Sequence, residues 1–221
     1  MGMDREQIAR LVLAELAQRN MRVIPARIPV GVSVRHVHLS RLDINRLFGD
    51  GYALGELKPI SQPGQFAAQE QVTLIGPHGR RLERVRIIGP EREETQIELA
   101  RTDAIFLGLS PPVRMSGDLQ NTPGITLAVN DRSLYAARGV IIAARHIHMK
   151  AADAAVWGLK DGGIISIHVE GEKGGLMENV HVVMNSRCAL DFHIDTDDAN
   201  AFGISEGQWI EFTGGKWRVK L

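Results

Sequence analysis

Histidine occurs in two copies of one short pattern, and this repeat has a clear chemical meaning. The two segments are Arg35-His36-Val37-His38-Leu39 and Arg145-His146-Ile147-His148-Met149. The chain has 221 residues and eight histidines, so the two copies contain half of its histidines. Each copy follows an apolar run, which predicts that each lies at the end of a β-strand. Because residues i and i+2 of a strand point to the same face, the two imidazoles of each pair are expected to project together.

Paired imidazoles on one face of a strand are typical ligands of a borderline metal such as Zn²⁺. The alternative is that each pair is a polar strand edge without a ligand. Two copies in matching contexts favour a shared task at the interface between two halves of the chain. Further candidate ligands are His193, after another apolar run, and Glu98, on an alternating stretch with Gln96. Arg92 precedes Glu98, and a guanidinium beside a metal can bind phosphate or carboxylate. Taken singly, Glu98 could be a solvated carboxylate and Arg92 a surface charge.

Composition limits the class of protein. Lys plus Arg equals Asp plus Glu at 26 each, and no segment is strongly basic, so nothing indicates a nucleic-acid partner. A single cysteine, Cys188, excludes an intrachain disulfide framework and a thiolate zinc cluster. No run approaches the roughly 18 apolar residues of a membrane span, and the first 20 residues lack the apolar core of a signal peptide. We therefore expect a soluble cytoplasmic protein without a membrane partner.

The hydrophobic pattern predicts a mainly β chain with short helices. Short apolar runs broken by Gly and Pro favour β-barrels over a parallel α/β sheet. We predict hairpins over 71–88 and 163–184, and a short helix after each histidine pair, over 40–47 with Ser40 as its cap and over 150–157. The internal repeat predicts two β-barrel domains, over 29–138 and 139–221, which could exchange strands.

The N-terminal segment, residues 1–28, is predicted to be an amphipathic helix and a linker. Over residues 4–19, apolar side chains recur at helical spacing, at Ile8, Leu11, Val12 and Leu16. Residues 21–28, with prolines at 25 and 29, follow as the linker. Such a helix could pack on the folded domain or serve as a targeting or oligomerisation peptide.

A set of motifs in chain order carries a resemblance to a known family. The motifs are Val32 to Ser40, Gln62 to Ala67, Gly89-Pro90 with Arg92, Gln96-x-Glu98, Arg114 to Gly117, Thr122 to Gly124, Ala144 to Met149 and His193 to Asp197. From about Pro29 to Gly203, the chain resembles the PduL-type phosphotransacylases, also called phosphate propanoyltransferases. The resemblance implies two pseudo-symmetric β-barrels with an active site between them that holds two divalent ions, usually zinc. It also implies reversible transfer of a short acyl group, acetyl or propanoyl, between coenzyme A and inorganic phosphate.

The resemblance assigns roles to individual positions. Its metal ligands fall on His36, His38 and Glu98 for one ion and on His146, His148 and His193 for the other. Its essential arginine falls on Arg92, and its other polar site positions fall on Gln96 and Ser116, taken as catalytic, and on Gln62 and Gln65, taken as substrate-binding. Its contacts to coenzyme A fall near Ser33, Lys58, Arg86 and Asn200.

The chain departs from the family pattern at one strand. The family usually has Val-Arg-Val where this chain has Val182-Val183-Met184, and Arg187 is the residue that could reach the same space. The N-terminal helix resembles the encapsulation peptides that bring family members into bacterial microcompartments. This implies shell or enzyme partners and a location inside a microcompartment, and we also expect a homo-oligomer.

Two other functions stay open on the sequence. A cupin-like metal-dependent oxygenase or isomerase uses a similar ligand set on a β-barrel, although it needs only one His-x-His. A non-enzymatic, zinc-stabilised microcompartment protein would use the histidines as structural ligands. A covalent acyl-cysteine route is disfavoured, because Cys188 is the only thiol and lies on an apolar stretch.

Overall fold

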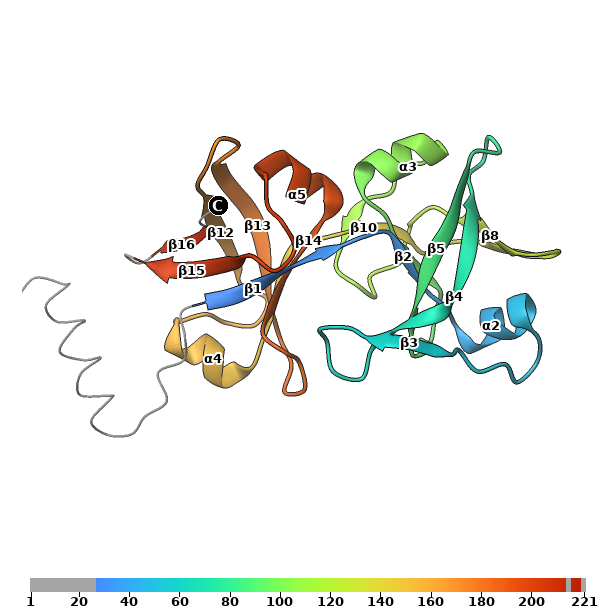
Figure 1. Cartoon of the computed structure of the whole chain (residues 1–221), viewed down its shortest axis with the longest axis horizontal. Helices are drawn as coiled ribbons and strands as arrows, with labels where there is room; N and C mark the ends of the chain where they lie inside the picture. The colour runs from blue at the N-terminus through green and yellow to red at the C-terminus, as the bar shows by residue number, and fades with distance from the viewer. Residues whose placement is uncertain (1–26, 214–215, 220–221) are drawn as a thin grey trace, which may run out of the picture.

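The computed structural model describes residues 27–213 and 216–219 of the chain. These residues form two β-sheets that lie side by side along the long axis of the molecule, with four short helices packed on them (Figure 1). The prediction of a mainly β fold with short helices is confirmed. The predicted helix over 4–19 lies outside the described residues.

One sheet closes into a barrel. Its strands, in order around the barrel, are β1 (Arg27–Ser33), β14 (Asp191–Asp195), β11 (His146–Met149), β13 (Gly175–Met184), β12 (Ile164–Val169), β16 (Lys216–Val219) and β15 (Trp209–Thr213). β1 is parallel to β14 and antiparallel to β15. Pro29 is the last residue of β1 that pairs with β15, and the pairing with β14 begins at Val30. The missing N–H of Pro29 therefore leaves the ladder with β14 intact. Residues 27 and 28 thus belong to β1 and not to the predicted linker.

The second sheet stays open and forms a half-barrel. Its order is β7 (Val113–Arg114), β10 (Val140–Ala143), β6 (Gln96–Glu98), β2 (His36–His38), β5 (Arg81–Gly89), β4 (Phe66–Ile75), β8 (Ile125–Val129) and β9 (Arg132–Ala136), and β3 (Glu56–Pro59) pairs with β4. Both predicted hairpins are confirmed, as β4 with β5 and as β12 with β13.

Each histidine pair forms a strand of its own, which corrects the prediction that it ends the preceding strand. β1 ends at Ser33 and β2 begins at His36, whereas β10 ends at Ala143 and β11 begins at His146. The chain changes sheets across each gap, because β1 and β11 belong to the barrel while β2 and β10 belong to the open sheet. Both histidine pairs therefore lie where the two sheets meet. The predicted division between residues 138 and 139 stays a prediction. Strand pairing crosses it twice, because β1 pairs with β14 and β15 and β10 pairs with β6 and β7.

An arginine occupies each gap and binds a helix. Arg35 donates to Asp103 of α3 (Arg101–Leu107) at 2.7 Å. Arg145 makes a two-pronged contact with Asp198 of α5 (Thr196–Phe202) at 2.7 and 2.8 Å. These charge-assisted contacts anchor the chain to a helix where it leaves one sheet for the other.

The predicted helix after each histidine pair is present. Ser40 caps α2 (Arg41–Phe48) by accepting from the backbone N–H of Asp43 at 3.2 Å, and α4 is Ala151–Val156. Sequence reasoning did not find α3 or α5. No side chain of its own caps α3, and its Thr102 N–H donates to Asp197 of α5 at 2.8 Å, so the two helices are joined across the interface.

Two hydrophobic cores lie behind the strands that carry the polar residues. The aliphatic residue between each pair of histidines, Val37 or Ile147, is fully buried. Ile97 of β6 and Phe192 of β14 are buried beside them, in the core of the open sheet and of the barrel respectively. Strand alternation thus sends one residue into a core and its two neighbours toward the other sheet.

Candidate active site

The first candidate ligand set joins β2 to β6. The two strands are antiparallel, with His36 opposite Glu98. The Nε2 atoms of His36 and His38 lie 3.5 and 3.7 Å from the two carboxylate oxygens of Glu98. The Nδ1 atom of His38 contacts the carbonyl of Ile88 on β5 at 3.1 Å, so a proton there leaves Nε2 free to bind a metal.

The second candidate set joins β11 to β14 in the same way. These strands are antiparallel, with His146 opposite His193. The Nε2 atoms of His146 and His148 are 3.1 Å apart, and His193 contacts Asp191 through Nε2 at 2.8 Å. Nδ1 of His148 is buried without a hydrogen-bond partner among the described residues. The clustered imidazole nitrogens form a donor set that a bound cation would satisfy.

Equivalent backbone contacts orient the first histidine of each pair. Nδ1 of His36 lies 2.9 Å from the carbonyl of Val34, and Nδ1 of His146 lies 2.7 Å from that of Ala144. In each case the carbonyl lies in the gap between strands and accepts the Nδ1 proton, which directs Nε2 toward the site. The ligand atoms within each set of three all lie within 4.8 Å of one another.

Burial and the charges within the first set leave Glu98 ionised and His38 neutral. Burial would raise the pKa of Glu98, but His36, His38 and the nearby Arg92 outweigh it, so that pKa lies below its usual range. Burial opposes protonation of His36, yet the Glu98 carboxylate raises its pKa above the usual 6.5. Burial, followed by repulsion from His36 and Arg92, lowers the pKa of His38 to about 3. The set therefore offers one carboxylate and at least one neutral imidazole at neutral pH.

Burial keeps the two histidines of β11 neutral. Burial, and then the neighbouring His193, lower the pKa of His146. Burial, and then repulsion from His146 and His193, lower the pKa of His148 to about 4. Neutral imidazoles are the form that binds metal ions.

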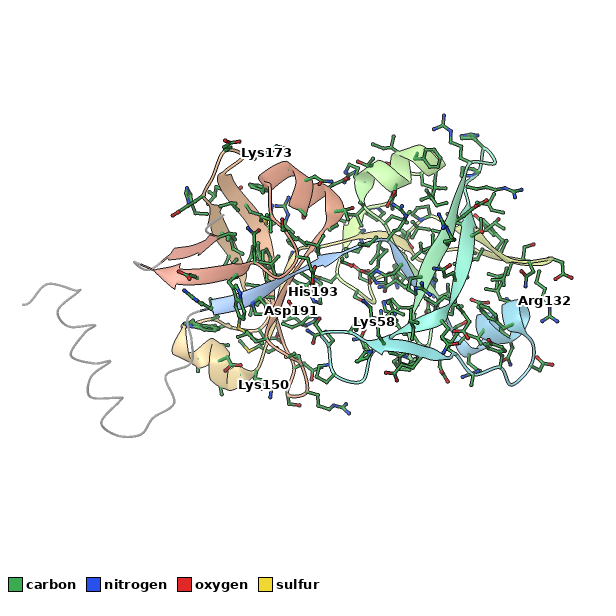
Figure 2. All side chains as sticks on the ribbon, in the orientation of Figure 1. Lys58, Arg132, Lys150, Lys173, Asp191 and His193 are labelled. Carbon is green, nitrogen blue, oxygen red and sulfur yellow. The ribbon has the colours of Figure 1, made fainter. Side chains whose placement is uncertain are left out.

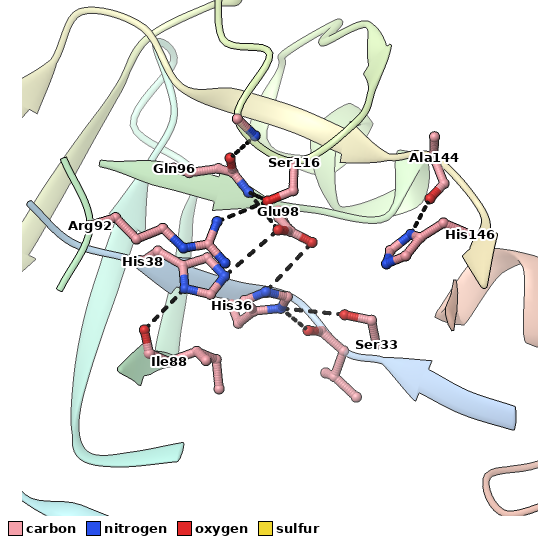
Figure 3. A network of polar contacts seen from close by, with 12 residues as sticks. Ser33, His36, His38, Ile88, Arg92, Gln96, Glu98, Ser116, Ala144 and His146 are labelled. Atoms are coloured by element: carbon pink, nitrogen blue, oxygen red, sulfur yellow. Dashed lines mark hydrogen bonds and ion pairs between the residues drawn. The ribbon is translucent and has the colours of Figure 1, made fainter. Parts of the chain in front are cut away.

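Polar side chains connect the first set to Arg92 (Figure 3). Arg92 donates to the hydroxyl of Ser116 at 2.8 Å, and Gln96 donates to the same oxygen at 2.9 Å. The Gln96 amide also donates to Glu98 at 2.6 Å, and its oxygen accepts from the Gly117 N–H at 2.8 Å. Because the Ser116 oxygen accepts two hydrogen bonds, its own proton is available for a third group.

Both sets open into one cavity of about 1490 Å³ between the sheets. Figure 3 shows His146 beside the first set, with its ring directed toward Glu98. The structure brings nearly all of the predicted site residues to this cavity. Its lining includes all six candidate ligands, Arg92, Ser116, Gln62 and Gln65, together with the four positions predicted for coenzyme A, Ser33, Lys58, Arg86 and Asn200. Gln96 does not line it and lies buried behind Glu98 and Ser116.

Gln62, predicted to bind substrate, has its polar atoms engaged by the backbone of Ala189. Its side-chain amide donates to the carbonyl of Ala189 and accepts from the N–H of the same residue, both at 3.3 Å. The two residues come from opposite sides of the interface, and Gln62 is buried. Its polar atoms already have partners, which favours a role in joining the two halves.

The strand that departs from the family pattern also faces the site. Val183 lines the large cavity, whereas Arg187 lines a smaller neighbouring cavity of about 270 Å³ that His148 also lines. The Cys188 thiol is buried and donates to the carbonyl of Asn185 at 3.0 Å. A thiol held in this way gives no support to a covalent route.

Three residues at the site escaped sequence reasoning. Asp191 is buried against His193, and Ser61 lies 3.5 Å from the same imidazole. Arg84 lines the cavity near Arg86 and has a φ of 56°, where β5 carries an extra residue relative to β4. A β-bulge redirects side chains, and the sequence shows no signal for one at this position.

Comparison with known proteins identifies the family. The phosphate propanoyltransferase family matches residues 29–205. The chain belongs to this family. It is 50% identical to a phosphate propanoyltransferase of Thermotoga maritima over 182 residues, covering 82% of this chain and 86% of the relative. It is 45% identical to a phosphate propanoyltransferase of Salmonella typhimurium over 205 residues, covering 91% of this chain and 93% of the relative.

Family membership confirms the predicted class of enzyme, an acyltransferase that acts between acyl-CoA and phosphate. It favours this class over the cupin-like oxygenase or isomerase and over the non-enzymatic zinc-binding protein. None of the helices in the described residues has both the length and the apolar character needed to cross a membrane.

Proposed function

We propose that this protein reversibly transfers a short acyl group, acetyl or propanoyl, between coenzyme A and inorganic phosphate at a centre of two divalent metal ions. The single observation that carries the proposal is the convergence of both ligand sets, Arg92 and Ser116 on one cavity. A site with only one ligand set would suffice for a cupin-like reaction, so the second set favours the acyl transfer.

Both ligand sets suit zinc. His36, His38 and Glu98 would hold one ion, and the three histidines of the second set would hold the other, with three protein ligands each. Three protein ligands are typical of catalytic zinc, because a further position stays open for substrate. When bound, the ions would act as Lewis acids that stabilise negative charge on the reacting oxygens.

We assign phosphate binding to Arg92. Its guanidinium is half-buried, contacts Ser116 and lies near Glu98, so one face is held by the protein while the cavity face can pair with phosphate oxygens. The free proton of Ser116 can then donate to the same phosphate or to the thioester carbonyl oxygen. Gln96 donates hydrogen bonds to both Ser116 and Glu98 and so fixes their positions relative to each other.

The reaction balances without a protein nucleophile. An oxygen of phosphate forms a bond to the thioester carbonyl carbon, the carbon–sulfur bond breaks, and coenzyme A leaves as a thiolate with the bonding electrons. Binding both substrates in one cavity would lower the entropic part of the activation barrier. Lys58 and Arg86, on the wall of the same cavity, are suited to the phosphates of coenzyme A.

The test is a phosphate-dependent thioester assay on the full-length protein. With acetyl-CoA or propanoyl-CoA, loss of thioester absorbance should require phosphate, and hydroxylamine should trap one acyl phosphate per thioester consumed. Removing metal with a chelator should abolish the activity, and zinc should restore it. Thioester hydrolysis at the same rate without phosphate would refute the proposed reaction.

The N-terminal segment supports a proposal about location. An amphipathic helix over residues 4–19 would suit recruitment to a microcompartment shell or self-association into a homo-oligomer. The apolar spacing of that segment is what supports it, together with the resemblance of the helix to encapsulation peptides.

A further inference from the structure

The two ligand sets are built on the same strand geometry, and the correspondence extends one residue beyond the ligands. In the open sheet, His36 of β2 is opposite Glu98 and His38 is opposite Gln96. In the barrel, the first histidine of β11 is opposite His193 and the second is opposite Asp191. Asp191 therefore occupies, relative to the second set, the place that Gln96 occupies relative to the first.

The contacts of these two residues correspond as well. Gln96 is buried and donates to Glu98, the third ligand of the first set, at 2.6 Å. Asp191 is 3% exposed, and its Oδ2 lies 2.8 Å from Nε2 of His193, the third ligand of the second set. Figure 2 places Asp191 and His193 together in the middle of the molecule, where the sheets meet. A buried carboxylate is costly unless it is hydrogen-bonded, which indicates a specific use for this one.

Backbone packing holds this pair in place. Gly31 of β1 is opposite His193 in the barrel ladder. A Cβ atom on Gly31 would lie 2.9 Å from Cδ2 of the His193 ring and 3.3 Å from Oδ1 of Asp191. The ring edge that carries Cδ2 and Nε2 thus lies close to Gly31 and to the Asp191 carboxylate, and Nδ1 lies on the opposite edge of the ring.

We propose that Asp191 is a positioning residue that fixes the imidazole of His193 for the second metal ion, as Gln96 fixes Glu98 for the first. The carboxylate accepts the Nε2 proton and thereby leaves Nδ1 as the metal-binding nitrogen of His193. The inference rests on the proposed two-metal centre. Loss of such an outer contact typically weakens metal binding by about 10- to 100-fold.

The test measures zinc affinity by chelator competition in two backgrounds. In His38→Ala, zinc binding reports the second set, and in His148→Ala it reports the first. Asp191→Ala should weaken zinc binding about 10- to 100-fold in the first background and leave it unchanged in the second. Asp191→Asn keeps an oxygen acceptor and should restore part of the affinity. Asp131→Ala, in the exposed turn between β8 and β9, is the matched control and should change neither.

Two further readouts separate positioning from other roles. When His193→Ala is added to the His38→Ala background, Asp191→Ala should cause no further loss of zinc affinity, because Asp191 acts only through His193. Nitrogen-15 spectra of the zinc-loaded protein should show the His193 proton on Nε2. A further loss in the His193→Ala background, a proton on Nδ1, or unchanged affinity in Asp191→Ala would each overturn the inference.

If Asp191→Ala does not fold, the same comparisons are made with Asp191→Asn, which should lose several-fold in affinity. Fewer than two zinc ions on the unsubstituted protein would refute the metal centre itself.

Discussion

In the proposed reaction, Arg92 is the cation that pairs with phosphate, because its Ser116 contact fixes the side chain and Glu98 lies near it. We predict that Arg92→Ala lowers phosphate-dependent turnover by about 30- to 1000-fold, or about 2–4 kcal/mol in the transition state. Binding of the thioester should change far less. Steady-state rates at varied phosphate check this, with Arg138→Ala, a surface arginine paired with Glu94, as the control. Wild-type activity at subsaturating phosphate would contradict the role.

Removing a single candidate ligand should abolish activity without unfolding the protein. His38→Ala and His148→Ala each remove a ligand from a different set while leaving the core residues Val37 and Ile147 in place. We expect each variant to lose turnover, to bind close to one ion in place of two, and to keep a cooperative thermal transition. Elemental analysis with a melting curve measures this. A fully active preparation with one ion or fewer per chain would contradict the two-ion centre.

Acid should release metal from the first set. The pKa of His36 is raised by Glu98, so below that raised pKa the protein must lose a proton from His36 to bind zinc. His38, with a pKa of about 3, and the ionised Glu98 need no such loss between pH 5 and 8. Zinc affinity of the His148→Ala protein should therefore fall about tenfold per pH unit below the His36 pKa. A constant affinity from pH 7.5 to 5.5 would show that Glu98 does not couple to His36.

For single residues, the sequence predicted the candidate ligands that the structure brings together, but not the residues that position them. The alternation in His-x-His and Gln-x-Glu is visible in one strand at a time, and it puts the polar residues on one face. The contact of Asp191 with His193 and that of Gln62 with Ala189 depend on which strands pair and in what register. The sequence of a short strand does not reveal its partner or its register.

Among the elements, β1 supplies a surface against which His193 is held. Gly31→Ala should push the ring away from Asp191 and weaken zinc binding to the second set, although alanine in a strand suits the backbone better than glycine. We expect a clear loss of affinity with a melting temperature that changes by only a few degrees. The matched control is Gly175→Ala in β13, where the added Cβ would meet only ordinary contact, at 3.4 Å from Phe202. Equal zinc affinities in the two variants would contradict this packing.

The sequence predicted the hairpins and the helices α2 and α4 from local signals, such as the turn residues of the hairpins and the Ser40 cap of α2. It did not predict the break before each histidine pair, since aliphatic residues continue through the gap and only Arg35 and Arg145 interrupt them. It also did not predict α3, which is seven residues long and takes its cap from Asp197 in another part of the chain. A cap from a distant part of the chain produces no periodic pattern in the local sequence.

For the whole molecule, the role of the N-terminal segment can be tested by truncation. We predict that deletion of residues 1–20 spares turnover and reduces self-association or recruitment to a shell, because the apolar stripe has no assigned partner in the site. If the stripe packed on the folded chain, burial of its four side chains would contribute about 6–10 kcal/mol before entropy costs. Activity, light scattering and thermal melts check this, with full-length Leu11→Glu as the matched variant. A large drop in melting temperature would refute the targeting role.

The change of sheets at residues 34–35 and 144–145 also determines the order in which the two sheets can assemble during synthesis on the ribosome. The open sheet needs no strand beyond β10, so it can assemble, with the first ligand set, while the last third of the chain is still being made. β1 emerges before all of these strands, yet its partners β14 and β15 emerge near the end. Until then β1 is an unpaired strand with exposed hydrogen-bonding groups, and pairing across so long a separation is slow. A nascent chain halted between these two stages would therefore carry one complete candidate ligand set and one unpaired, aggregation-prone strand, and is the species on which a chaperone would act.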